Sequence, residues 1–267
     1  MQGLSVKERR KALEFAMQLA RSVGGEIAKK ADRHKHISFK GEVDLVTQFD
    51  REAQRMILKS LKNNYSDFGV LSEEDINEET DRPVKWIVDP LDGTTNFAHG
   101  LPIWAISIAL EVQGDIVLGV VYDPNRDEMF SSSEKGGAYL NGRRIRVSTT
   151  GKLEHSLLVT GFPYDIRKSK KNNLLEFSTF AVRARAVRRL GSAALDLCYT
   201  ACGRFDGYWE LKLSPWDQAA GSLILREAGG RITDFVGQKF TIYGDEVLGT
   251  NRKIHRQMIR VFESLQT

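Results

Sequence analysis

Residues 88–96 read VDPLDGTTN, and this stretch constrains the fold more than any other. Two aspartates, Asp89 and Asp92, directly follow the apolar triplet at 86–88, where a buried strand is expected to end. Placing two close carboxylates at the end of a buried strand costs free energy unless a cation compensates their charge. The stretch therefore predicts a buried strand that ends at a cation-binding site.

The residues after Asp92 favour a tight turn followed by a helix. Gly93 lets the backbone turn, and the next amide groups can open a short helix whose free N–H groups attract an anion. The Thr94 hydroxyl can hold an attacking water. Carboxylates that gather cations beside an anion-binding helix start are what the hydrolysis of a phosphate ester requires.

Two further acids occur in comparable places. Glu73 follows a short apolar run in LSEED, and Asp217 lies near a helix start in PWDQAAG. Mg²⁺ takes about six oxygen ligands, drawn from a few carboxylates and from water. Asp89, Asp92 and the Leu91 carbonyl can converge on one point, and Asp89 is placed to bridge two ions. The sequence thus predicts a magnesium site built from three distant segments.

Each acid also has an ordinary structural explanation. Asp92 and Gly93 form a common turn pair, Asp217 can cap a helix, and Glu73 can be a solvated loop acid. The explanations are weaker together, because an apolar strand that runs into two close carboxylates is costly unless a cation compensates. Residues 72–96 also hold eight acids and two bases in a chain of net charge +4, which is consistent with cation binding there. No cysteine or histidine is placed to act as a nucleophile, so we expect water to attack.

The order of the predicted elements favours stacked layers of helices and sheets. Helices are expected over 4–31 and 45–64, strands over 68–75 and 84–90, and an antiparallel meander over 105–145. Strands and helices then alternate, and Ser192 is the expected N-cap of one helix. The predicted helices of this second part cover 172–184, 193–203, 214–230 and 252–266.

The composition is that of an ordinary globular protein. The chain has 267 residues, 41% hydrophobic and 28% charged, with two cysteines. A core of this size needs no disulfide. Cys198 and Cys202 are spaced as two metal ligands could be, but no nearby histidine or third cysteine completes a site, so we expect core residues. So few cysteines fit a reducing, cytoplasmic compartment. No stretch approaches the roughly 18 apolar residues of a membrane span, and the amphipathic start does not resemble a signal peptide.

Two motifs together resemble those of a known family. WIVDPLDGTTNFAHGLP and, later, WDQAAG closely resemble the paired motifs of the inositol monophosphatase family, the Mg²⁺-dependent, lithium-sensitive phosphatases. The resemblance extends to GEVDLVTQFD, to LSEED and to LGSAALDLCYTACGRFDGYWE, so it covers nearly the whole chain. Ser72 stands where the family has a glycine, which removes no ligand.

The resemblance implies the metal ligands. Glu73, Asp89 and the Leu91 carbonyl match the ligands of a first Mg²⁺, and Asp89, Asp92 and Asp217 match those of a second. Glu73 also matches a ligand of a weaker third ion. Mn²⁺ is an alternative to Mg²⁺ at these positions.

The resemblance also implies the catalytic and substrate contacts. Asp50 and Thr94 match the pair that orients the nucleophilic water, with Glu73 beside them in the catalytic set. The amides of Gly93 and Thr94 match the phosphate cradle, and Lys40 and Asp44 match a loop that helps to close the site. Four residues match contacts to the sugar or inositol hydroxyls: Asp92, Ala193, Glu210 and Asp217.

By the same resemblance we expect an α/β layered fold, a five-layered αβαβα sandwich. Residues 1–267 would form a single phosphatase domain, with a metal- and phosphate-binding half over 1–150 and an α/β half over 151–267. The expected reaction is release of phosphate from myo-inositol 1-phosphate by a metal-activated water, without a phosphoenzyme. A homodimer or homotetramer is expected, with no membrane association.

More than one substrate and role stays open. In an extended segment Arg183 and Arg185 would point the same way and face a second phosphate, as in relatives that hydrolyse fructose 1,6-bisphosphate; a solvated face or a subunit contact explains them equally well. A 3′-phosphoadenosine nucleotide, NADP and histidinol phosphate are further candidate substrates. Some bacterial relatives associate with RNA and transcription machinery, and because every metal ligand is retained here, such binding would be an added role.

Overall fold

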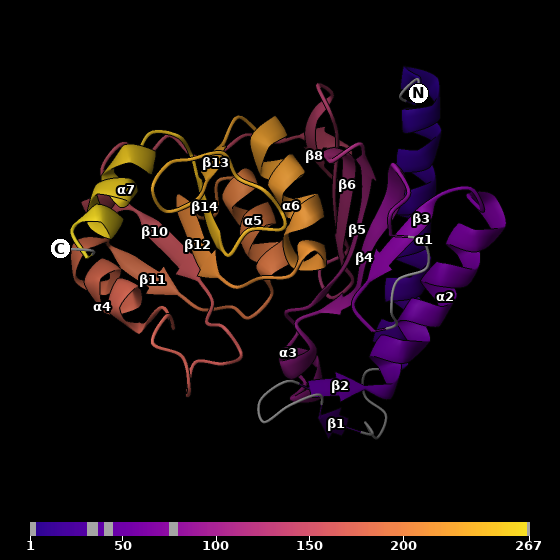
Figure 1. The fold of residues 1–267 in the computed structure, drawn as a ribbon, viewed down its shortest axis with the longest axis horizontal. Coiled ribbons are helices and arrows are strands. Elements are labelled where there is room, and N and C mark those ends of the chain that lie inside the picture. Colours follow the sequence, from indigo (N-terminus) through magenta and orange to yellow (C-terminus); the bar gives the residue numbers. More distant parts are fainter. Residues whose placement is uncertain (1–3, 31–36, 40–44, 75–79, 266–267) are drawn as a thin grey trace.

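The computed structural model describes residues 4–30, 37–39, 45–74 and 80–265. Helices and sheets alternate in five layers across the long axis of the molecule (Figure 1). From one end these layers are a helix pair, a seven-stranded sheet, a second helix pair, a five-stranded sheet and a third helix pair. The predicted five-layered α/β sandwich is confirmed.

The first layer holds the helices α1, Val6–Lys30, and α2, Gln48–Asn64. Apolar residues at helical spacing give α1 a buried stripe, which packs on the first sheet. The second helix begins three residues later than predicted, because the strand β2, Leu45–Thr47, pairs there with β1, Ile37–Phe39.

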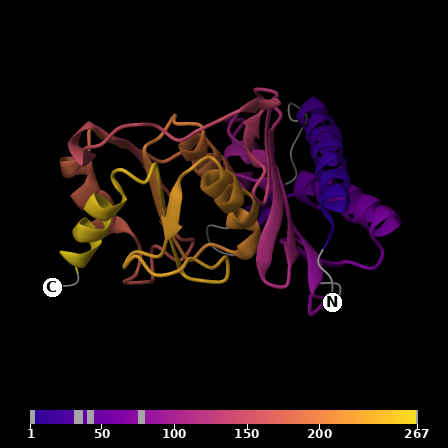
Figure 2. The ribbon, with the colours of Figure 1, turned by 90° about the horizontal axis from the view of Figure 1, so that it is seen from above.

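The seven-stranded sheet has the order β3-β4-β5-β6-β7-β8-β9. Its first pair is parallel, and the rest is the predicted antiparallel meander. Helices cover both of its faces (Figure 2), which explains why β5 is buried along its whole length. The strands are β3 Gly69–Ser72, β4 Val84–Asp92, β5 Ala105–Val112, β6 Asp115–Asp123, β7 Glu128–Ser133, β8 Gly137–Leu140 and β9 Arg143–Arg144.

The middle layer consists of α5, Ala193–Ala201, and α6, Pro215–Glu227. Every residue of α5 is buried, as expected for a helix between two sheets. The backbone of α6 lies directly on β6: a Cβ added at Gly119 would be 2.7 Å from the Ala220 carbonyl oxygen. This close approach sets the distance between α6 and the first sheet.

The five-stranded sheet has the order β11-β10-β12-β14-β13. Its first three strands are parallel, while β14 is antiparallel to both of its neighbours. The strand β13 had no equivalent in the sequence prediction. The strands are β10 Leu157–Thr160, β11 Ala186–Arg188, β12 Gly207–Leu211, β13 Arg231–Thr233 and β14 Glu246–Thr250.

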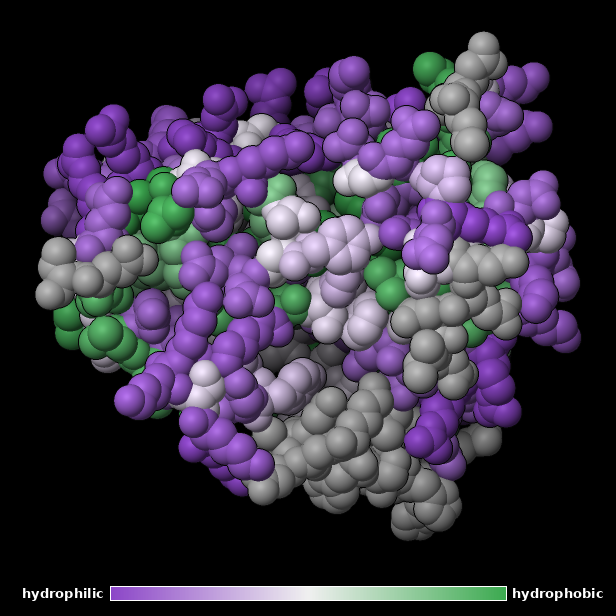
Figure 3. All heavy atoms as spheres, viewed as in Figure 1, coloured by the Kyte–Doolittle hydropathy of each residue, from purple (hydrophilic) through white to green (hydrophobic). Residues whose placement is uncertain are grey.

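The outer helices are α4, Leu174–Arg183, and α7, His255–Glu263. The outer face of α4 is apolar, since Leu174, Leu175 and Val182 are 50%, 56% and 84% exposed. Apolar atoms are visible at this end of the molecule (Figure 3, left). Among the described residues, no helix combines the length and the apolar character that crossing a membrane requires.

Candidate metal and phosphate site

Carboxylates from two segments far apart in the sequence meet between the two sheets. Asp89 and Asp92 end β4, and Asp217 lies in the first turn of α6. One ligand oxygen from each lies within 4.8 Å of the others. The structure thus brings together three of the acids that the sequence singled out.

Asp89 is the most deeply buried of the three, at 2% exposure. Its Oδ1 accepts a hydrogen bond from the Leu91 amide at 2.9 Å. Burial raises the pKa of Asp89 well above its ordinary value, and the charges of Glu73, Asp92 and Asp217 raise it further. Because its charge acts on Asp89, Glu73 belongs to the same electrostatic cluster.

Asp92 is held by the start of α5. Its Oδ2 accepts hydrogen bonds from the Ser192 hydroxyl and, at 2.9 Å, from the Ala194 amide. Burial raises the pKa of Asp92 to about 6, and these hydrogen bonds oppose the rise. Ser192 also accepts from the Leu195 amide, which confirms the predicted N-cap. Its second role, orienting Asp92, was not foreseen.

Hydrogen bonds with neighbouring residues fix the segments that carry Asp217 and Glu73. Asp217 accepts a hydrogen bond from the Ser214 amide at 2.7 Å, so it supports the start of α6 without being its N-cap. Burial raises the pKa of Asp217 well above its ordinary value, and the charges of Asp92 and Glu73 add to the effect. Gln54 of α2 accepts from the Ser72 hydroxyl and, at 3.0 Å, from the Glu74 amide, on either side of Glu73.

The short helix expected after the turn is α3, Thr94–Ala98. Its N-cap Gly93 has φ 99°, a left-handed conformation that favours glycine. The Thr94 hydroxyl lies 2.8 Å from Oδ1 of the fully buried Asp50 and 3.1 Å from the Leu91 carbonyl oxygen. The pair expected to orient a water is therefore in contact, directly beside the carboxylates.

A second group of polar side chains lies behind the start of α5. Glu210 of β12 accepts a hydrogen bond from the Tyr208 hydroxyl at 2.7 Å. Burial raises the pKa of Glu210 to about 7, and the charge of Asp92 adds to this rise. The hydrogen bond from Tyr208 and the charge of Arg189 oppose it. Ala193, the other expected hydroxyl contact, is the first residue of α5 and is buried.

Arg183 and Arg185 were expected to face a second phosphate from one extended segment. This is wrong for Arg183, which is the last residue of α4. Both arginines precede β11, whereas Glu210 lies near the carboxyl end of β12, which runs in the same direction. Arg189 follows β11 and is the arginine whose charge reaches Glu210. It belongs to the same basic run over 182–189, but sequence position alone does not show that its charge reaches Glu210. Lys40 and Asp44 lie outside the described residues.

The oxygen-rich cluster fits a divalent cation. In the described part of the chain, no lysine, arginine or histidine forms an ion pair with Asp89, Asp92 or Asp217. Burial raises the pKa of all three, and the charge of Asp92 raises the pKa of the other two further. Hard carboxylate oxygens at this spacing are ligands that Mg²⁺ and Mn²⁺ accept.

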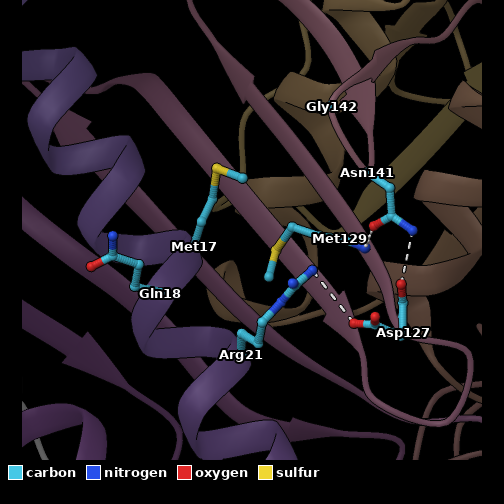
Figure 4. Close-up of a pocket in the computed structure, with 7 residues that line it drawn as sticks. All are labelled: Met17, Gln18, Arg21, Asp127, Met129, Asn141 and Gly142. Carbon is cyan, nitrogen blue, oxygen red and sulfur yellow. Dashed lines mark hydrogen bonds and ion pairs between the residues drawn. The ribbon is translucent and has the colours of Figure 1, made fainter.

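A separate pocket of about 510 Å³ lies between α1, the turn before β7 and the turn between β8 and β9 (Figure 4). Arg21 of α1 pairs with Asp127 at 3.4 Å across it, and Met17 and Met129 line it. None of the residues predicted to act in catalysis lines this pocket, so it is distinct from the carboxylate cluster.

The arrangement agrees with comparisons to known proteins. The model of the inositol monophosphatase family matches residues 8–267. The chain belongs to this family. An inositol monophosphatase from Anabaena (Nostoc) sp. PCC 7120 superposes with a TM-score of 0.88 at 38% identity, covering 96% of each chain.

Two relatives carry different names. An inositol-1-monophosphatase from Synechocystis sp. is 45% identical over 248 residues, which cover 92% of this chain and 86% of that protein. Nus factor SuhB from Escherichia coli (strain K12) is 39% identical over 257 residues, covering 95% and 96%. Relatives of the chain thus include a protein named inositol-1-monophosphatase and one named Nus factor SuhB.

Magnesium is expected to stabilise this inositol monophosphatase family member in a pH-dependent way. The folded-state pKa values of Asp89, Asp92 and Asp217 are raised. Without metal, the free energy of unfolding therefore falls as pH rises from about 4 through those values. Ion binding needs the charged forms. At a hundredfold excess over its Kd, Mg²⁺ should add about 2.7 kcal/mol to the free energy of unfolding at about pH 8, and much less at about pH 5.

Urea unfolding with and without Mg²⁺ at both pH values measures this effect. Asp115→Asn, which changes an exposed acid at the start of β6, serves as the control and should keep the full magnesium effect. A stabilisation of equal size at both pH values would show that the ion binds elsewhere.

Proposed function

We propose that the protein is a Mg²⁺-dependent phosphate monoester hydrolase whose preferred substrate is myo-inositol 1-phosphate. The observation that carries the proposal is the meeting of Asp89, Asp92 and Asp217 beside the contact between Thr94 and Asp50. The name of the Synechocystis relative supports the choice of substrate. Two or three Mg²⁺ ions, or Mn²⁺ in their place, are the proposed cofactors.

The ligand assignment follows the cluster. Glu73, Asp89 and the Leu91 carbonyl are proposed to hold one ion, and Asp89, Asp92 and Asp217 a second. Bound divalent ions supply positive charge that makes a water more acidic and stabilises a departing alkoxide. Burial of the acids in a site of low dielectric strengthens that effect.

The chain's own groups position the reactants. Asp50 accepts from the Thr94 hydroxyl, which leaves the lone pairs of Thr94 Oγ1 to accept a hydrogen bond from a water. The amides of Gly93 and Thr94 are proposed to bind phosphate oxygens. On the side of the alcohol, Ala193 and Glu210 are proposed to contact hydroxyls, together with Asp92 and Asp217.

We also propose that residues 1–267 act as one catalytic unit. The ligand Asp92 comes from the half over 1–150, and the groups that orient it, Ser192 and Ala194, come from the half over 151–267. Neither half alone supplies a complete site. A homodimer or homotetramer and a cytoplasmic location remain predictions.

Replacing Asp92 by asparagine is expected to remove most of the activity. The amide oxygen can still accept from Ser192 and Ala194, so the fold should persist, but the negative charge is lost. By the usual effect of losing a group that stabilises transition-state charge, kcat should fall about a hundredfold or more. Phosphate release and a melting curve measure the two properties, with Asp115→Asn as the control; near-wild-type turnover would refute the assignment.

A panel of esters separates the candidate substrates. With Mg²⁺ present, kcat/KM for inositol 1-phosphate should exceed that for fructose 1,6-bisphosphate, the 3′-phosphoadenosine nucleotide, NADP and histidinol phosphate. Lithium should inhibit the reaction. Arg183 and Arg185 lie at the amino end of β11, which disfavours a second phosphate site built from them. A higher kcat/KM for fructose 1,6-bisphosphate would reverse the order of the two proposals.

Binding to RNA or to transcription machinery is a second candidate role, favoured by the name Nus factor SuhB of the Escherichia coli relative. The net charge of +4 is compatible with it. The Asp92→Asn variant separates the roles, because it should lose turnover and keep its basic surface. Retention of RNA by this variant that weakens steeply with salt would support binding, and no retention at low salt would exclude RNA as the partner.

A further inference from the structure

Glu210 occupies space that only a glycine opposite it can provide. The parallel strands β10 and β12 place Thr160 opposite Trp209, so Gly161 follows opposite Glu210. A Cβ added at Gly161 would lie 2.5 Å from Glu210 Oε2 and would overlap its Cδ and Oε1. The three atoms nearest to that position all belong to Glu210. The carboxylate therefore leans across onto the backbone of the neighbouring strand.

A hydrogen bond fixes the same carboxylate from the other side. Tyr208 stands two residues before Glu210, so both side chains leave the same face of β12. The Tyr208 hydroxyl donates to Glu210 Oε2 at 2.7 Å, and Tyr208 is fully buried. Gly161 thus leaves the space for this direction of the Glu210 side chain, and the hydrogen bond from Tyr208 holds it there.

The side chain of Asn173 holds β10 and β12 together beside Gly161 and Glu210. The fully buried Asn173 donates to the Gly161 carbonyl at 2.6 Å and to Thr160 Oγ1 at 2.8 Å, and it accepts from Trp209 Nε1 at 2.6 Å. One side chain thus holds the residues next to the Gly161–Glu210 pair on both strands. If β10 slipped past β12, Asn173 could not keep its bonds to both strands.

The charges around Glu210 oppose its joining the metal ligands. Asp92 raises the pKa of Glu210, so the two carboxylates repel each other. Asp196, one turn into α5, is also buried, and its Oδ1 has no hydrogen-bond partner among the described residues. Arg189 is the positive charge that acts on both Glu210 and Asp196. Repulsion by Asp92 opposes the entry of Glu210 into the ligand set, and Arg189 favours its charged form, which can only accept hydrogen bonds.

We propose that Gly161 and Tyr208 are positioning residues that aim Glu210 at a hydroxyl of the substrate's alcohol. They thereby make the site selective for polyol phosphates over esters whose alcohol carries no other hydroxyl. The inference rests on the proposed phosphatase function and extends it to two residues that do not touch the reacting atoms. Its distinguishing mark is an effect on substrate selectivity, since a purely structural role would affect all esters alike.

The first test is Gly161→Ala, with inositol 1-phosphate and phenyl phosphate as the two substrates. The added methyl group displaces Glu210, so kcat/KM for inositol 1-phosphate should fall about tenfold to a hundredfold, as expected when a charged hydrogen bond is lost. The loss should lie mainly in KM. The value for phenyl phosphate, which has no hydroxyl for Glu210 to accept from, should change far less.

A double-mutant cycle shows whether the effect passes through Glu210. In a Glu210→Ala background the methyl group meets no carboxylate, so Gly161→Ala should have little further effect on either substrate. Tyr208→Phe should shift selectivity in the same direction, to a smaller extent. Tyr199→Phe is the matched control, because its buried hydroxyl donates to Asp123 at 3.3 Å instead, and it should keep the wild-type ratio of the two substrates.

Two results would overturn the proposal while leaving the phosphatase function intact. One is equal losses for both esters in Gly161→Ala. The other is an undiminished effect of Gly161→Ala in the Glu210→Ala background. If the wild-type protein released phosphate from neither ester, the proposed function would fail and the positioning proposal with it. Melting curves of each variant identify any loss that comes from unfolding.

Discussion

The burial of neighbouring carboxylates is the constraint on which the rest of this structure depends. Asp89, Asp92 and Asp217 are held within a few ångströms of one another; burial raises the pKa of each, and neighbouring acids add to the rise at Asp89 and Asp217. Left alone, such a cluster would take up protons or move apart. The fold resists this with amide and hydroxyl donors, and a divalent cation would remove the remaining penalty.

The layered architecture supplies those donors from both halves of the chain. The start of α5 reaches Asp92 through Ser192 and Ala194, and Asn96 donates to the Leu190 carbonyl at 2.7 Å just before that helix. The helix α6, packed closely on β6, carries Asp217 to the same place. The site is therefore a product of packing between the two sheets, and it is complete only when both are folded.

The sequence alone predicted those features of the site that depend on neighbouring residues in the chain. Two aspartates after an apolar strand, a glycine before a short helix and a serine before an apolar helix each have a local physical meaning, and Asp89, Asp92, Gly93 and Ser192 lie as that meaning predicts. Grouping Asp217 with the pair in β4 rested on its similar setting, an acid near a helix start, and on the resemblance to a family, because nothing local links residues so far apart.

Non-local features escaped prediction. Arg183 and Arg185 were expected to point the same way in one extended segment, but Arg183 is the last residue of α4, and the arginine whose charge reaches Glu210 is Arg189. Gly161 gave no signal at all, because its importance arises only when β10 and β12 lie side by side. In both cases the deciding contact joins segments that sequence spacing does not relate.

The most direct test of the central claim is to locate the ion. A crystal of the protein grown with Mn²⁺, which scatters anomalously and accepts the same oxygen ligands as Mg²⁺, would be measured for anomalous difference density. The account predicts peaks among the side-chain oxygens of Asp89, Asp92 and Asp217. Full occupancy of Mn²⁺ elsewhere, with these carboxylates bare, would contradict it.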